Sequence, residues 1–105
     1  MLNLDNPDPE IFAMIRRREE YMNASLVIPE LFRIRLRSSF NKKINSYGLK
    51  NKVTEYLDKL NPTGYNYCDI DSLTIALLDM GYKARKESLG KRSENPNYIF
   101  NIKVI

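Results

Sequence analysis

Histidine and tryptophan are absent from this chain of 105 residues, and cysteine occurs once, as Cys68. Histidine is the commonest general base and the commonest metal ligand, so its absence removes the usual means of proton transfer and of zinc binding. A single cysteine can form neither an internal disulfide nor a zinc site. We therefore expect a protein that is not an enzyme and that has no catalytic residues, no metal site and no cofactor.

Long apolar runs are missing as well. The run from Ser25 to Ile28 ends at Pro29, far short of the roughly 20 apolar residues that cross a bilayer. The first ten residues lack the basic start and apolar core of a signal peptide. With the lone cysteine, these absences predict a cytoplasmic protein without a membrane partner.

The composition itself is that of a globular protein, with 43% hydrophobic and 29% charged residues. The length suits one domain over residues 1–105, because a second core would have too little area. Eleven asparagines, with many Lys, Ile and Tyr residues, resemble the translation of the AT-rich genomes of many phages and low-GC bacteria.

A first helix is predicted from Asp8 to about residue 22. Asp8 can accept hydrogen bonds from free amides of the first turn, Pro9 suits the first helical position, and Glu10 complements the positive helix end. The apolar face of this helix would hold four side chains, Ile11, Met14, Ile15 and Met22.

Two periods compete in the next segment. Phe32, Ile34 and Leu36 alternate with arginines, as in a half-buried strand over residues 31–37, yet apolar residues also recur every four positions from Ile28 to Ile44. Because Pro29 and the residue after it suit a first helical turn, we favour a helix over residues 29–44. A strand would extend the carboxy-terminal hairpin into a three-stranded sheet.

Two further helices follow. Leu49, Val53 and Leu57 begin each new turn of an amphipathic stripe that reaches Leu60, and Asn61–Gly64 stops it. The next helix is expected to be capped by Asp71, with Ile70 and Ile75 as a hydrophobic staple. Gly81 can take the left-handed exit conformation, and Tyr82 can fold back on Leu77.

The carboxy-terminal part predicts a hairpin. Residues 83–89 form a weakly patterned strand, residues 90–97 are rich in turn formers, and Tyr98, Phe100, Ile102 and Val104 alternate with the residues between them. The whole chain is therefore expected to be an α+β domain of three to four helices with a carboxy-terminal antiparallel hairpin.

The net charge of +4 lies in the hairpin, because residues 82–105 hold six basic and two acidic side chains and residues 1–81 hold eleven of each. A second stretch, 31–52, is basic without an acid. Such polarity steers charged partners. The expected contacts to a partner or a nucleic acid are Arg33, Arg35, Arg37, Lys83, Arg85, Lys86, Lys91, Arg92, Tyr82 and Tyr98. An alternative contact is acidic, as a mimic of phosphate: Glu55, Asp58, Asp69, Asp71 and Asp79.

The segment from Ser72 to Ile102 resembles the end of a winged-helix domain, with a helix, a Leu77–Gly81–Tyr82 exit, a strand, a basic loop and a returning aromatic strand. The resemblance implies a hairpin that acts as a wing against phosphates. It departs from that family in the recognition helix, which has no Arg or Lys between Asp69 and Tyr82. A stable α+β core with lysines on an edge strand is the plainer interpretation.

The pair Asp69 and Asp71 could hold Mg²⁺, but helix capping explains both residues more simply. Two functional hypotheses remain. The first is a protein-binding module, a phage or mobile-element product that inhibits or modulates a host protein; a homodimer is a further possible arrangement. The alternative is a winged-helix-like protein that binds DNA or RNA through phosphates.

Overall fold

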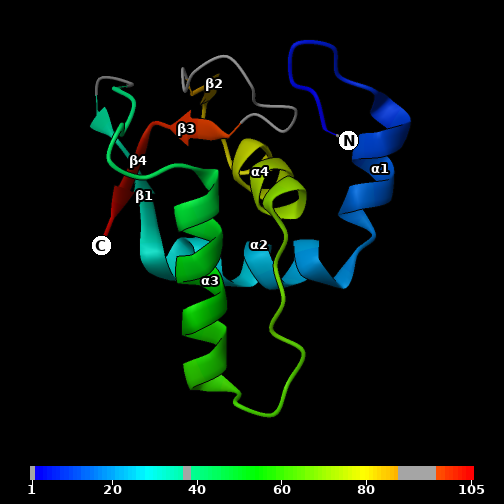
Figure 1. Ribbon diagram of the computed structural model, residues 1–105, viewed down its shortest axis with the longest axis vertical. Coiled ribbons are helices and arrows are strands. Elements are labelled where there is room, and N and C mark those ends of the chain that lie inside the picture. Colours follow the sequence, from blue (N-terminus) through cyan, green and yellow to red (C-terminus); the bar gives the residue numbers. More distant parts are fainter. Residues whose placement is uncertain (1, 37–38, 88–96) are drawn as a thin grey trace.

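The computed structural model describes residues 2–36, 39–87 and 97–105. These residues form an α+β fold with an antiparallel hairpin near the carboxy terminus, as the sequence predicts. The chain begins beside the first helix and ends on the opposite side of the molecule (Figure 1). In chain order the elements are α1 (Pro9–Arg16), α2 (Glu19–Leu31), β1 (Phe32–Ile34), α3 (Ser46–Leu60), α4 (Ile70–Asp79), β2 (Ala84–Lys86), β3 (Tyr98–Phe100) and β4 (Ile102–Val104).

Helix α4 is the centre of the fold. It packs against α1, α2 and α3 (Figure 1), and every residue from Ser72 to Leu77 is buried. Leu73 and Leu77 join the main core with residues of α2, α3 and the strands, whereas Ile75 forms a smaller cluster with Leu2 and Ile15. The mostly apolar middle of α4 suits such a central position, and the two polar side chains there, Ser72 and Thr74, are buried as well.

The amino-terminal helix is two helices, so the prediction of one helix to about residue 22 is wrong. The chain leaves helical geometry at Arg18, whose backbone is extended, and α2 then runs to Leu31. Because the chain breaks here, α1 and α2 pack in different directions. Ile15 of α1 joins the smaller apolar cluster, and Val27 of α2 joins the main core. Met14 and Met22, expected on the buried face, are exposed.

The preferred helix over residues 29–44 is also wrong. Pro29 lies in the last turn of α2, and β1 follows directly at Phe32. The alternation of Phe32 and Ile34 with arginines was therefore the informative period. It prevails because burying Phe32 in the main core on one face of a strand leaves Arg33 in solvent on the other.

Both later helices occur where the sequence predicts them. Asn45 caps α3 through a hydrogen bond from the Gly48 amide, and α3 ends at Leu60. Asp69, not Asp71, caps α4, because its side chain accepts from the Ser72 amide. Helix α4 ends as expected, with Gly81 at φ 94° and the Tyr82 amide donating to the Leu77 carbonyl at 3.1 Å.

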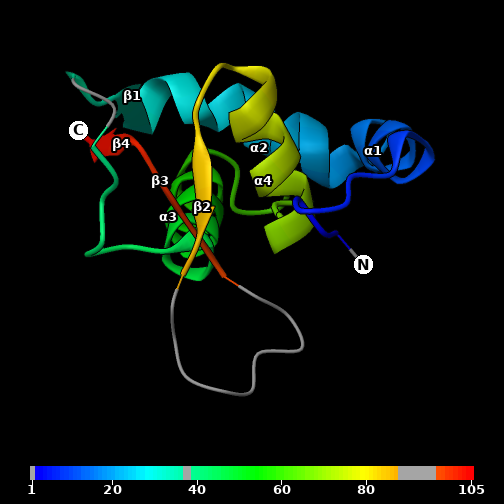
Figure 2. The ribbon, with the colours of Figure 1, turned by 90° about the horizontal axis from the view of Figure 1, so that it is seen from above.

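The strands form two antiparallel pairs. Hairpin β2–β3 pairs Ala84 with Phe100, while β1 pairs with β4. The alternative of a strand in this region is confirmed by β1, but the three-stranded sheet attached to that alternative does not form, because the chain bends at Asn101, between β3 and β4. Asn101 joins the two pairs: its amide donates to the Lys83 carbonyl, and its own carbonyl accepts from the Arg35 amide. Figure 2 shows β3 running on into β4, with β2 and β1 beside successive parts of this segment.

Within the described ranges, no helix is long and apolar enough to cross a membrane.

Candidate functional site

Strands β1 and β4 each present one positive charge to solvent beside an apolar row. The register places Arg33 directly opposite Lys103 of β4, and both side chains are exposed. Like charges opposite each other destabilise an antiparallel pair. Arg35, one residue beyond β1, adds a third cation to the same end of the ladder. An anionic partner would relieve this repulsion.

A hollow of about 620 Å³ lies over these cations. We call it the basic hollow. Large apolar side chains accompany the charges, since Leu36 is 89% exposed, Ile105 is 68% exposed and Ile34 is 48% exposed. No acidic residue is in the described lining, which consists of Arg33, Ile34, Arg35, Leu36, Ser39, Lys103 and Ile105.

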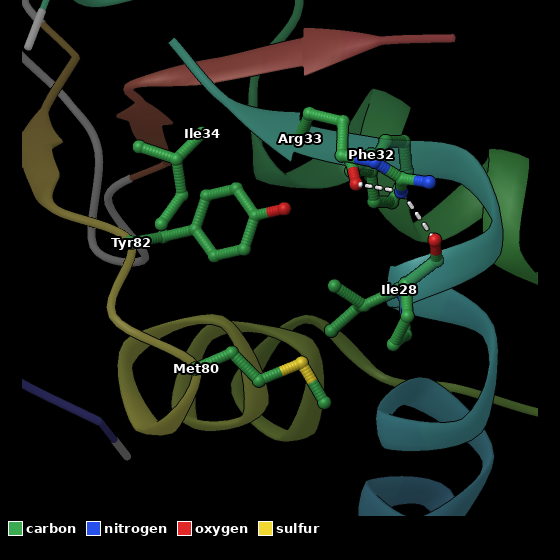
Figure 3. A pocket seen from close by; sticks show the side chains of 7 residues that line it. Ile28, Phe32, Arg33, Ile34, Met80 and Tyr82 are labelled. Carbon is green, nitrogen blue, oxygen red and sulfur yellow. Dashed lines mark hydrogen bonds between the residues drawn. The ribbon is translucent and has the colours of Figure 1, made fainter. Parts of the chain in front are cut away.

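A second hollow of about 500 Å³ lies between the end of α2, β1 and the exit of α4 (Figure 3). We call it the apolar hollow, and the two hollows together the β1 surface. They share Arg33 and Ile34. Its described lining also lacks an acid and consists of Ile28, Pro29, Phe32, Arg33, Ile34, Met80 and Tyr82. A volume of several hundred Å³ suits a large side chain or a small ligand.

Tyr82 carries a polar group into the apolar hollow. Its ring points into the space between β1 and α2, with the hydroxyl at the tip (Figure 3). The residue is only 7% exposed, and no described residue hydrogen-bonds to that hydroxyl. Burial raises the pKa of Tyr82, and the positive charge of Arg33 offsets part of this effect. The neutral hydroxyl can therefore donate or accept a hydrogen bond at neutral pH.

Arg33 has a structural role in addition to its charge. Its Nη1 donates to the carbonyls of Pro29 and Phe32, which lie at the carboxyl end of α2 (Figure 3). A cation at this end of a helix is favourable, because the last carbonyls lack partners. Among the described residues only Nη1 is engaged in this way, so the remaining guanidinium nitrogens are available to a ligand.

Of the five expected hairpin cations, two are engaged within the molecule, one is exposed and two lie outside the described residues. The guanidinium of Arg85 stacks 4.7 Å from the centre of the Phe40 ring, and Lys86 Nζ lies 3.8 Å from Asp5 Oδ2. Lys83 is exposed. Arg37, Lys91 and Arg92, also expected as contacts, lie outside the described residues, as does the predicted turn 90–97 up to residue 96.

The two expected tyrosine contacts are not surface platforms. Tyr98 is buried in the main core, and its hydroxyl accepts a hydrogen bond from the Leu4 amide. Tyr82 is equally buried but borders the apolar hollow. With so little exposed surface, neither ring is an open platform on which a base could stack in this conformation.

The five acidic residues do not form one patch. Asp69 and Asp71 lie at the start of α4 and Asp79 at its end, so ten residues, or about 15 Å, separate them. Glu55 and Asp58 are on α3. Arg18 pairs with Asp69 at 3.3 Å, and Arg16 pairs with Asp79 at 2.8 Å. These pairings use the acids to join helices.

The start of α4 is a capping site. Asp69 accepts from the Ser72 amide, and burial together with the charge of Asp69 raises the pKa of Asp71. In the described part of the chain, no group of three His, Cys, Asp or Glu side chains could hold a metal. Cys68 is buried, and burial raises its pKa to about 12, so its thiol stays protonated and unreactive at neutral pH.

Helix α4 is also poorly placed to read DNA. In addition to lacking cations, it is covered on the faces that Ser72 to Leu77 occupy. A recognition helix must lie open to the major groove. The winged-helix resemblance stays a prediction, since the described residues include the helix and the hairpin strands but not the wing loop.

Sequence reasoning named three of the twelve described residues that line the β1 surface, namely Arg33, Arg35 and Tyr82. It did not include Lys103, Ile105 or Met80, because only the register of β1 with β4 and the exit of α4 bring them beside Arg33. The sequence held one signal for an exposed apolar surface. The apolar alternation that begins at Phe32 continues through Ile34 to Leu36, which is farther than one buried contact of a short strand requires.

Comparison of the chain with protein-family models, with curated proteins and with solved structures found no match. The fold and the β1 surface define it as a small α+β domain with an exposed, mixed basic and apolar face.

Proposed function

We propose that this protein is a small, non-enzymatic protein-binding module that inhibits or modulates a larger protein by covering part of its surface. The composition typical of AT-rich genomes is the ground for proposing a phage or mobile-element origin and a host protein as the target. The β1 surface is the proposed contact.

One observation carries this proposal: Ile34, Leu36 and Ile105 are exposed next to three cations. Phosphates offer nothing to aliphatic side chains, whereas protein interfaces combine apolar contacts with arginine and complementary charge. Exposed apolar groups that cluster over a hollow are typical of interaction sites.

Nucleic-acid binding is the second candidate, and the arrangement of the strands favours it. Strand β1 ends opposite Ile102 and β2 begins opposite Phe100, so the residues beside these two strand ends, Arg35 and Lys83, both bond to Asn101. Arg33, Arg35 and Lys83 thus follow one another beside a single carboxy-terminal segment. A row of cations of this kind suits a phosphate backbone, and such binding weakens steeply as salt rises.

Affinity capture with three matched baits tests the first proposal. The baits are the wild-type chain, an Ile34→Asp/Leu36→Asp variant and a Leu60→Asp variant, all used in nuclease-treated host lysate. Leu60 is 64% exposed at the far end of α3, so its variant adds a surface charge away from the β1 surface. We expect the same protein with the wild type and the control, and its loss with the double variant.

Two results contradict the proposal. One is that no protein is captured above background by the wild type; the other is that the double variant retains the same protein. Circular dichroism must show that all three baits are folded. Binding of duplex or single-stranded oligonucleotides with a steep salt dependence, abolished by neutralising Arg33 and Arg35, supports the second candidate instead.

A further inference from the structure

We infer that the β1 surface recognises an acidic peptide segment with one large apolar side chain, which enters the apolar hollow while flanking carboxylates contact the cations. This inference rests on the proposed function and names the chemistry of its partner. It commits to a segment of another protein as the occupant.

The apolar hollow defines the anchor. Ile28, Phe32, Ile34 and Met80 provide aliphatic, aromatic and thioether contacts from three elements around a space of about 500 Å³. Figure 3 shows the side chains of Ile34 and Met80 on two sides of Tyr82. One Leu, Met or Phe side chain fits a space of this size and would remove the exposed atoms of Ile34 and Met80 from water, since Ile28 and Phe32 are already buried.

The Tyr82 hydroxyl defines a polar neighbour of that anchor. The residue is 7% exposed, and no described residue hydrogen-bonds to its hydroxyl, which keeps some contact with solvent because it is not among the fully buried polar atoms of the described residues. The hydroxyl points into the hollow, and the positive charge of Arg33 acts on it. A carboxylate bound by Arg33 can accept from this hydroxyl, which a lysine or an arginine of a partner could not do.

Charge complementarity sets the sign of the flanking residues. Arg33, Arg35 and Lys103 line the adjoining basic hollow, and its described lining contains no acidic side chain. An anion over the pair would lower the repulsion between Arg33 and Lys103, which lie directly opposite each other. Acidic residues on both sides of the anchor would reach these three cations.

Selection from a library of random short linear peptides, displayed against the immobilised full-length chain, tests this inference. We expect enriched peptides to carry several Asp or Glu residues around one Leu, Met or Phe. The enriched peptides are then synthesised, and their affinities are measured by calorimetry for the wild type and for the variants Ile34→Asp, Arg35→Glu, Tyr82→Phe and Leu60→Asp.

We expect about tenfold weaker binding for each of the first three variants, since each loses one apolar, ionic or hydrogen-bonding contact, and unchanged binding for Leu60→Asp. Tyr82→Phe removes only one oxygen atom, so its fold is preserved by the same ring packing. Replacing the acids of a peptide by their amides should weaken binding to a similar extent.

The inference is overturned if the enriched peptides lack acidic residues, or if Ile34→Asp and Arg35→Glu bind as tightly as the wild type. It is overturned as well if no peptide binds with a dissociation constant below about 1 mM. It is also overturned if an oligonucleotide displaces the peptides at low salt but not at high salt, which is the salt dependence of phosphate binding. Should affinity capture succeed while the selected peptides are not acidic, the proposed function stands and this inference alone fails.

Discussion

Asn101 connects the two strand pairs through three hydrogen bonds. Its side-chain Oδ1 accepts from the Lys83 amide at 2.7 Å, its own amide donates to the Lys83 carbonyl, and its carbonyl accepts from the Arg35 amide. The residue is only 2% exposed. In a regular strand, a backbone carbonyl of the neighbouring strand would accept from the Lys83 amide. Here the side-chain oxygen of Asn101 accepts instead.

Replacing Asn101 by Ala should therefore destabilise the protein. The Lys83 amide would lose its acceptor in a partly buried hydrogen bond, which costs about 1 kcal/mol. The free energy of unfolding in urea, measured beside the exposed control Asn6→Ala, gives the difference. A loss no larger than that of the control would contradict this role.

Asp79 joins three helices through its carboxylate. Arg16 of α1 donates to both carboxylate oxygens at 2.9 and 2.8 Å, and the Tyr21 hydroxyl of α2 donates at 2.6 Å. The hydrogen bond from Arg16 is the largest cause that lowers the pKa of Asp79 below its ordinary value of 3.8. The same contacts raise the pKa of Arg16, with Asp79 as the first cause.

Asp79→Asn should lower the free energy of unfolding by about 1 kcal/mol at neutral pH, because Arg16 is partly exposed and water screens the pair. The sign of the pH dependence follows from the lowered pKa. The stabilisation is complete above the ordinary value of 3.8 and is lost as the pH falls through the lower folded-state value.

Urea titrations of wild type and Asp79→Asn at several pH values test both statements. The difference between the two proteins should be constant near neutral pH and shrink below about pH 4. Glu55→Gln, on the exposed side of α3, is the matched control and should show little difference at any pH. A difference that grows on acidification would contradict the assignment.

At the scale of elements, the exit of α4 depends on Gly81. Its φ of 94° places it in the left-handed region, which allows the Tyr82 amide to reach the Leu77 carbonyl. This turn also directs Tyr82 into the apolar hollow. Gly81 therefore both ends α4 and sets the direction of Tyr82 in the candidate site.

Gly81→Ala should destabilise the protein by about 1 kcal/mol, since a Cβ is unfavourable at this φ. The space around it is ordinary: a Cβ there would lie 3.8 Å from Ile34 Cδ1. Conformation is thus the main cause. Gly81→Asn should lose less, because asparagine tolerates the left-handed region better. Thermal unfolding of the three proteins checks the order, which equal melting temperatures would disprove.

The like charges of Arg33 and Lys103, which lie opposite each other, lower the stability of the β1–β4 pair. Lys103→Glu would replace the repulsion with Arg33 by a cross-strand ion pair, which should stabilise the fold by about 0.5 kcal/mol. Added salt should reduce this gain by screening. Lys52→Glu on α3 serves as the exposed control. A destabilised Lys103→Glu variant would show that the opposed charges do not repel appreciably.

The elements were predictable where caps and periods agreed. The stripe from Leu49 to Leu60 and the Gly81 exit specify α3 and the end of α4 by local chemistry alone. Residues 29–44 failed because two periods fit the same residues, and the choice depended on where Phe32 finds its core partners. Those partners include Phe100 and Ile102, which are distant in sequence.

At the scale of the whole molecule, the sequence indicated cations but not their neighbours. Arg33 and Arg35 were expected contacts, yet the pairing with Lys103 and the nearness of Met80 and Tyr82 depend on long-range packing. The positions of the acidic residues were likewise not predictable from the sequence. They were grouped by sequence, and the fold distributes them over α3 and the two ends of α4.

The molecule therefore has two different surfaces for charge. Asp79 and Asp69 are consumed in contacts between helices, whereas the cations of the β1 surface have no described acidic neighbour in its lining. A surface that keeps like charges together beside exposed Leu36 and Ile105 is costly to the fold unless something binds it. Partner binding through this surface is the central claim.

Photocrosslinking inside the host cell tests that claim most directly. A photoreactive residue replaces Leu36 in one variant and Leu60 in another, since both side chains are exposed but only Leu36 borders the β1 surface. The account predicts one discrete protein adduct from position 36, identified by mass spectrometry, and none of the same identity from position 60. No adduct at position 36, the same adducts from both positions, or an adduct with a second copy of this chain alone would contradict it.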